Sequence, residues 1–152
     1  MKEFLYRGVS EVFFKINNGK LTPKQPGKRF ASHTECGDET AQCGSSMTCG
    51  FSAYNEAVRH QFMQKGLPTS GISTTPNIER AKFYATKGGK YLSGHIYIID
   101  RTKLSKFGVS EYIVNEIIPN PSIPEDNEVI IVAQDFKQIP KSVIIEIKHI
   151  TL

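Results

Sequence analysis

Residues 95–99 read HIYII, a run of β-branched and aromatic side chains that predicts a β-strand. Two similar runs follow it: residues 128–132 read EVIIV, and residues 142–148 read SVIIEIK and end in an alternating pattern. The helical signals all lie earlier in the chain, so strands and helices do not alternate regularly. This distribution predicts an α+β fold with mainly antiparallel β-sheets and with helices concentrated in the N-terminal half.

Two strands and a helix are predicted before this region. Residues 4–9 read FLYRGV and residues 71–75 read GISTT, and both runs favour strands. Thr75 and Pro76 suit the cap and first turn of a helix, which we expect to end near Lys87 because two glycines follow it.

Between these elements lies a long polar region. Residues 15–34 carry lysines and arginine with no acidic residue, together with prolines and glycines, and predict irregular structure that extends to about residue 50. Loops of this length are often functional. Ser52 then suits the N-cap of a further helix, through Met63, which Gly66 and Pro68 would stop.

Length and composition limit the classes of protein. The chain has 152 residues, which suits one domain of roughly 100–200 residues, and we expect residues 1–152 to form a single domain. With 39% hydrophobic and 10% aromatic residues, it is not a disordered chain. Its net charge of +4 is too small to indicate nucleic-acid binding, although the basic stretch could contact an acidic partner. No apolar run approaches the roughly 20 residues of a membrane span, and the N-terminus lacks the apolar segment of a secretory signal.

The cysteines leave two interpretations open. Cys36, Cys43 and Cys49 lie in one short stretch and, with His33, could offer four zinc ligands, but the tight Cys-x-x-Cys pairs common in structural zinc sites are missing. Reduced loop thiols are the alternative. The other three histidines, His60, His95 and His149, are scattered without metal-ligand spacing.

Three polar motifs could carry chemistry, although each also has an ordinary structural explanation. Arg7 lies in the opening strand, where a surface ion pair would explain it. Ser73 begins a run of hydroxyl residues before a helix, where a cap would need them. Asp126 and Glu128 lie where a loop enters a hydrophobic strand; a solvated acidic turn would explain them, but a carboxylate at that point is desolvated more than one on an open turn.

In this order the motifs resemble the Arg–Ser–Glu signature of the ADP-ribosyltransferases related to cholera toxin and the arginine-specific mono-ADP-ribosyltransferases. The matching segments are LYRG at residues 5–8, STT at residues 73–75 and DNEV at residues 126–129. Residues 76–85 also resemble the helix that follows the serine motif in that family, and residues 139–145 its closing strands. The resemblance implies an ADP-ribosyltransferase fold and NAD as co-substrate.

The resemblance also implies a role for each site residue. Glu128 would stabilise the positive charge that develops on the ribose as nicotinamide leaves, and Ser73 would orient that carboxylate. Arg7 would bind the pyrophosphate with a rigid, permanently charged donor group. Two aromatic residues, Phe83 and Tyr84, could hold the nicotinamide ring, although both could equally be core residues of the helix. The remaining NAD-contacting candidates are neighbours of the motifs: Tyr6, Gly8 and Thr74.

The residue two positions before the catalytic glutamate selects the acceptor in this family. Here it is Asp126, a carboxylate that could attract a guanidinium group and accept its proton, which favours transfer of ADP-ribose to a protein arginine. NAD hydrolysis at the same site and a non-catalytic basic binding module are the alternatives. No metal is expected at this site, and the protein would act in the cytosol of its own cell or of a target cell that it enters as a toxin or effector.

Overall fold

The computed structural model describes residues 3–27, 32–34, 50–52, 70–117 and 126–152. The first sheet has the strand order β1-β5-β8, with β5 (Ser93–Asp100) between β1 (Phe4–Ser10) and β8 (Ile144–Thr151). Both pairings are antiparallel, and Arg7 lies opposite Tyr97. The strand predicted over residues 95–99 is therefore the centre of this sheet, extended at both ends.

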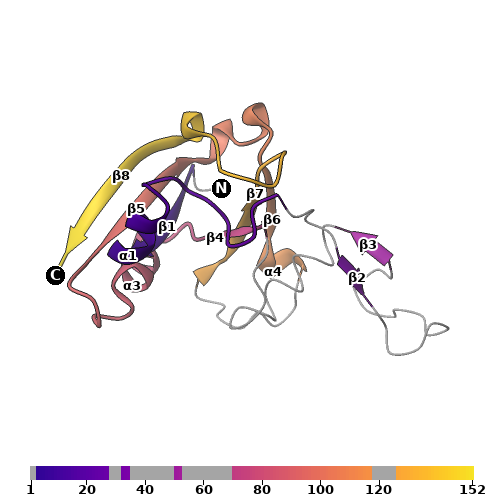
Figure 1. Cartoon of the computed structure of the whole chain (residues 1–152). Helices are drawn as coiled ribbons and strands as arrows, with labels where there is room; N and C mark the ends of the chain where they lie inside the picture. The colour runs from indigo at the N-terminus through magenta and orange to yellow at the C-terminus, as the bar shows by residue number, and fades with distance from the viewer. Residues whose placement is uncertain (1–2, 28–31, 35–49, 53–69, 118–125) are drawn as a thin grey trace.

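A second sheet has the order β4-β7-β6, with β7 (Val129–Val132) between β4 (Ile72–Thr74) and β6 (Ser110–Ile113). A third pair joins β2 (Ser32–Thr34) to β3 (Gly50–Ser52), on the right in Figure 1. Every strand pairing in the described residues is antiparallel, which confirms the predicted α+β class with antiparallel sheets.

The alternation of side chains along β5 divides the hydrophobic core in two. Tyr97 and Ile99 face a large buried cluster that also includes residues of the second sheet, whereas Ile96 faces the helix α3 (Ile78–Thr86) on the other side. This is the period-2 pattern of a strand buried on both faces. The first sheet is thus covered by the second sheet on one face and by α3 on the other.

Three backbone atoms of α3 lie very close to β1 at Gly8. A Cβ placed on Gly8 would come within 1.9 Å of the carbonyl oxygen of Ala81. Only a residue without a side chain allows the strand and the helix to approach this closely. The glycine after Arg7 therefore sets the distance between β1 and α3.

One backbone bridge joins the two larger sheets. The amide of Tyr6 donates to the carbonyl oxygen of Thr75 at 2.8 Å, and the amide of Thr75 donates to the carbonyl oxygen of Tyr6 at 2.9 Å. This antiparallel bridge connects β1 to the end of β4. It brings the strand that carries Arg7 beside the strand that carries Ser73.

Two helices, α1 (Glu11–Ile16) and α3, differ from the prediction. The structure contains α1 where irregular structure was expected from residue 15. The side chain of Ser10 caps this helix by accepting from the amide of Phe13 at 3.2 Å, which overrides the strand preference of its valine and phenylalanines. Asn77 rather than Thr75 caps α3, because the helix begins at Ile78 and the side chain of Asn77 accepts from the amide of Glu79 at 3.0 Å.

The other helices are short and lie late in the chain. They are α4 (Val114–Ile117) and the 3-10 helices η1 (Arg101–Lys103), η2 (Ser105–Phe107) and η4 (Lys141–Val143). Among the described residues, helices are therefore not concentrated in the N-terminal half. The helix expected from Ser52 through Met63 lies outside the described residues, apart from Ser52, which ends β3.

In the part of the chain that the structure describes, no helix combines the length and the apolar character required to cross a membrane.

We expect Gly8→Ala to destabilise the protein by about 1–3 kcal/mol or more, because the added methyl group would overlap the backbone of Ala81. Gly89→Ala is a matched control, since no atom lies within 4 Å of a Cβ at that position and only its positive φ is unfavourable. Denaturant unfolding of both variants gives the comparison. Equal losses of unfolding free energy would show that the contact with α3 is not the cause.

Candidate active site

A cavity of about 520 Å³ lies along the bridge between β1 and β4. Its size is within the range of roughly 300–1,000 Å³ that is typical of small-molecule sites. All the site residues predicted from the sequence except Phe83 line this cavity: Tyr6, Arg7, Gly8, Ser73, Thr74, Tyr84, Asp126 and Glu128.

Arg7 enters the cavity from the core-facing side of β1. It shares the strand face of Leu5 and Val9, both of which are buried in the main hydrophobic cluster. Its Nη1 donates to the carbonyl oxygen of Ser73 at 3.2 Å, while its Nε is buried without a hydrogen-bond partner among the described residues. Burial lowers the pKa of Arg7, and the negative charge of Glu128 partly offsets this effect. The guanidinium group therefore keeps an unused donor inside the cavity.

Ser73 and Glu128 meet across two neighbouring strands. Ser73 pairs with Ile130 in the β4–β7 register, so Glu128, two residues before Ile130, is its diagonal neighbour on the same face. The hydroxyl of Ser73 donates a hydrogen bond to Oε2 of Glu128, whose side chain is buried. The strand register thus aims a desolvated carboxylate into the cavity.

Asp126 is also buried, and both of its carboxylate oxygens are occupied. Oδ1 accepts from Nε of Arg80 at 2.6 Å, and Oδ2 accepts from the hydroxyl of Tyr84. Its backbone carbonyl accepts from Oγ1 of Thr75 at 2.6 Å. Asn127 follows with a φ of 48°, in the left-handed region that asparagine tolerates well. The turn at Asn127 therefore lies between two carboxylates with different partners: Asp126 contacts α3, whereas Glu128 contacts Ser73 of β4.

Helix α3 supplies the partners of Asp126 because Arg80 and Tyr84 are four residues apart and lie on one face of the helix. The pKa of Arg80 is raised by its hydrogen bond to Asp126. Burial and the hydrogen bond to Asp126 raise the pKa of Tyr84 to about 12. Tyr84 is therefore a neutral hydrogen-bond donor at neutral pH.

Phe83 is not among the residues that line the cavity. It lies one residue before Tyr84 and therefore points to a different side of α3, where it is 46% exposed. Its ring lies 4.6 Å from the guanidinium carbon of Arg80 and packs edge-on against Tyr84. Of the two aromatic residues considered for the nicotinamide ring, Tyr84 alone lines the cavity.

Two cationic residues at this site, Arg80 and Lys87, were not predicted from the sequence. The four-residue spacing of Arg80 and Tyr84 on a predicted helix was the available signal for the first. Lys24 belongs to the basic stretch, and with Thr22 and Pro23 it lines the cavity. The three cysteines of the possible zinc site lie outside the described residues, and His33 lies in β2.

These observations define an α+β protein whose two antiparallel sheets enclose a cleft with an arginine, a serine and two carboxylates. Residues 4–131, most of the chain, match the family model named NarE, and the chain belongs to this family. No curated protein matches the chain.

We expect Asp126→Asn to lower the pKa of Tyr84 from about 12 toward 10, because an anion that stabilises the protonated phenol is replaced by a neutral amide while Arg80 stays. Tyrosinate absorbance during a pH titration measures this change, and subtraction of the corresponding Tyr84→Phe curve isolates the one residue. An unchanged pKa would mean that Asp126 is not the hydrogen-bond partner of Tyr84.

Proposed function

We propose that this protein is an NAD-dependent mono-ADP-ribosyltransferase with an ADP-ribosyltransferase-like fold. It would transfer ADP-ribose from NAD to a protein side chain, with arginine as the favoured acceptor, and release nicotinamide. The observation that carries the proposal is the hydrogen-bonded series from Arg7 through Ser73 to Glu128 in one cleft. These residues come from distant parts of the chain and match the Arg–Ser–Glu order of that enzyme class.

Arg7 suits the pyrophosphate of NAD. Its guanidinium is permanently charged, and its buried Nε lacks a partner among the described residues, so an anionic oxygen would satisfy a donor that is otherwise costly to bury. Lys24 and Lys87 line the same cavity and add positive charge. This charge distribution favours a ligand with two negative phosphates.

Glu128 is placed to stabilise the positive charge that develops on the ribose in the transition state. When the bond between nicotinamide and ribose breaks, its electrons leave with nicotinamide, and positive charge develops on the ribose. A buried carboxylate, held in place by Ser73, interacts strongly with that charge because little water screens it. The acceptor nitrogen then forms a bond to the ribose carbon and gives its proton to a base, for which the carboxylate of Asp126 is the candidate.

Asp126 is the residue that would receive the acceptor arginine. Its carboxylate already binds the guanidinium of Arg80, so the site can hold a guanidinium group, but an incoming arginine must compete with Arg80. If no acceptor arginine displaces Arg80 from Asp126, water would react with the ribose carbon instead and release free ADP-ribose. This contact supports NAD hydrolysis as the second candidate function of the same cleft.

We expect Glu128→Gln to lower both nicotinamide release and protein labelling by a factor of roughly 100 or more, because the change removes the charge that stabilises the transition state. The assay incubates the protein with labelled NAD and a cell lysate. Glu146→Gln is the control, since Glu146 is exposed on β8 and does not line the cleft. Equal activity of the Glu128 variant and the parent would reject the site assignment.

We expect Asp126→Ala to reduce protein labelling more than nicotinamide release, because Asp126 acts on the acceptor and Glu128 on the sugar. Asp135→Ala, which removes an exposed carboxylate elsewhere, provides the matched control. The ratio of label on protein to free nicotinamide is measured for each variant. A parallel fall of both products would contradict an acceptor role, and release of nicotinamide without any protein label in the parent would favour the hydrolase.

A further inference from the structure

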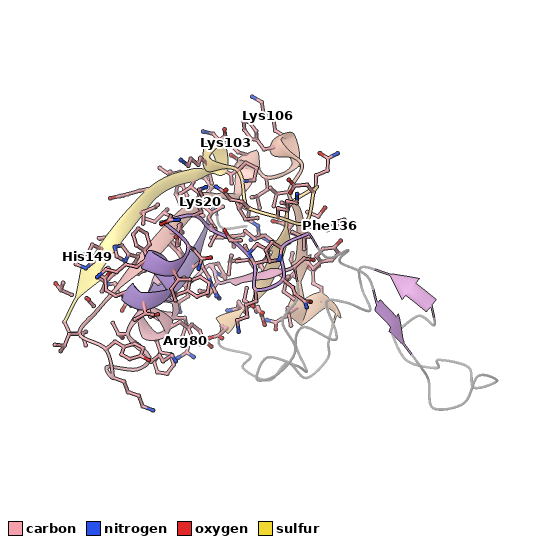
Figure 2. The ribbon with its side chains drawn as sticks, viewed as in Figure 1. Lys20, Arg80, Lys103, Lys106, Phe136 and His149 are labelled. Atoms are coloured by element: carbon pink, nitrogen blue, oxygen red, sulfur yellow. The ribbon has the colours of Figure 1, made fainter. Side chains whose placement is uncertain are left out.

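A second group of chemically active side chains lies away from the cleft. Glu11 begins α1, His95 lies in β5 and His149 lies in β8, and together they line a shallow, open depression of the surface that shares no lining residue with the cleft. Figure 2 shows His149 on β8 at the left of the molecule, away from Arg80 at its lower side. The proposed activity makes no use of this group.

The strand register brings the two histidines together. His95 and His149 are directly opposite in the antiparallel pairing of β5 and β8, so both imidazoles project from the same face of the sheet. Their ring centroids are 4.8 Å apart. Glu11 approaches both, with 2.7 Å from Oε1 to Nε2 of His149 and 3.6 Å from Oε2 to Nδ1 of His95.

Three potential ligand atoms, one from each residue, lie within 4.8 Å of one another. In a tetrahedral zinc site with bonds of about 2.0–2.1 Å, ligand atoms are ~3.3 Å apart. Small side-chain adjustments would therefore bring all three to coordinating distance.

A second observation that points to a ligand is the buried ring nitrogen of His95. Its Nδ1 is buried and has no hydrogen-bond partner among the described residues, although it faces Glu11. The ring is held in position by stacking on Phe14, with 3.6 Å between centroids and 8° between planes. Burial lowers the pKa of His95, which favours the neutral form that binds metals.

We propose that Glu11, His95 and His149 form a binding site for a divalent transition-metal ion, with zinc as the best match. Two imidazoles and one carboxylate are a common zinc ligand set, and three protein ligands leave a fourth position for water. Lys15, whose positive charge reduces affinity, also lines the depression, so we expect a moderate-affinity site. The ion links α1 to both β5 and β8 and stabilises the C-terminal strand.

Zinc binding to the metal-depleted full chain tests the proposal. Because the three cysteines could bind zinc themselves, the titration uses a variant in which Cys36, Cys43 and Cys49 are replaced by serine. Calorimetry should give one zinc ion per chain, and Co²⁺ should give the visible absorption of a tetrahedral site. The thermal midpoint should rise with zinc, since the ion binds the folded state.

In the same background, Glu11→Gln and His149→Gln should each weaken zinc binding by roughly tenfold or more and reduce the thermal shift. Both side chains are partly or largely exposed, so these variants should fold. His33→Gln is the matched control and should leave binding unchanged. Absence of zinc binding in the cysteine-free parent, or binding that neither the Glu11 nor the His149 variant weakens, would overturn the proposal. These readouts do not involve NAD and are therefore independent of the proposed enzyme activity.

Discussion

The pair of backbone hydrogen bonds between Tyr6 and Thr75 is the constraint on which the site depends. It fixes the end of one sheet against the edge of the other, and the residues next to it in each strand are Arg7 and Thr74. Because backbone hydrogen bonds specify register, they also specify which side chains meet. The cleft follows directly from this junction, since both strands contribute residues to its wall.

The cleft also requires that each buried carboxylate has hydrogen-bond donors or a positive charge beside it. Asp126 has two donors from α3, and Glu128 has the hydroxyl of Ser73 and the nearby positive charge of Arg7. An unpaired buried charge typically costs about 3–5 kcal/mol when its partner is removed. The cleft therefore holds two carboxylates with different partners: one in a carboxylate–guanidinium pair and the other aimed by a neutral hydroxyl.

Hydrophobic patterning identified the central strands because residues 96–99 and 129–132 are apolar or aromatic throughout, and nearly all of them are buried. It gave no prediction for residues 10–14, where α1 begins: Val12, Phe13 and Phe14 have side chains that favour a strand, but the cap from Ser10 and packing on β5 produce a helix. It also gave no prediction for β6, whose four residues, SEYI, are stabilised by pairing with β7 rather than by their own preference.

The residue types of the candidate site could be predicted from the sequence: a guanidinium, a hydroxyl and two carboxylates, which meet in one cleft. Their partners were not readable, because Ser73 and Glu128 are 55 positions apart and Arg80 and Asp126 are 46 positions apart. The same holds for His95 and His149, which have no sequence spacing typical of a metal site but are opposite in the sheet. Local sequence specifies strands and turns through side-chain preference, whereas strand register and the contact of α3 with the first sheet select the charged groups that finally touch.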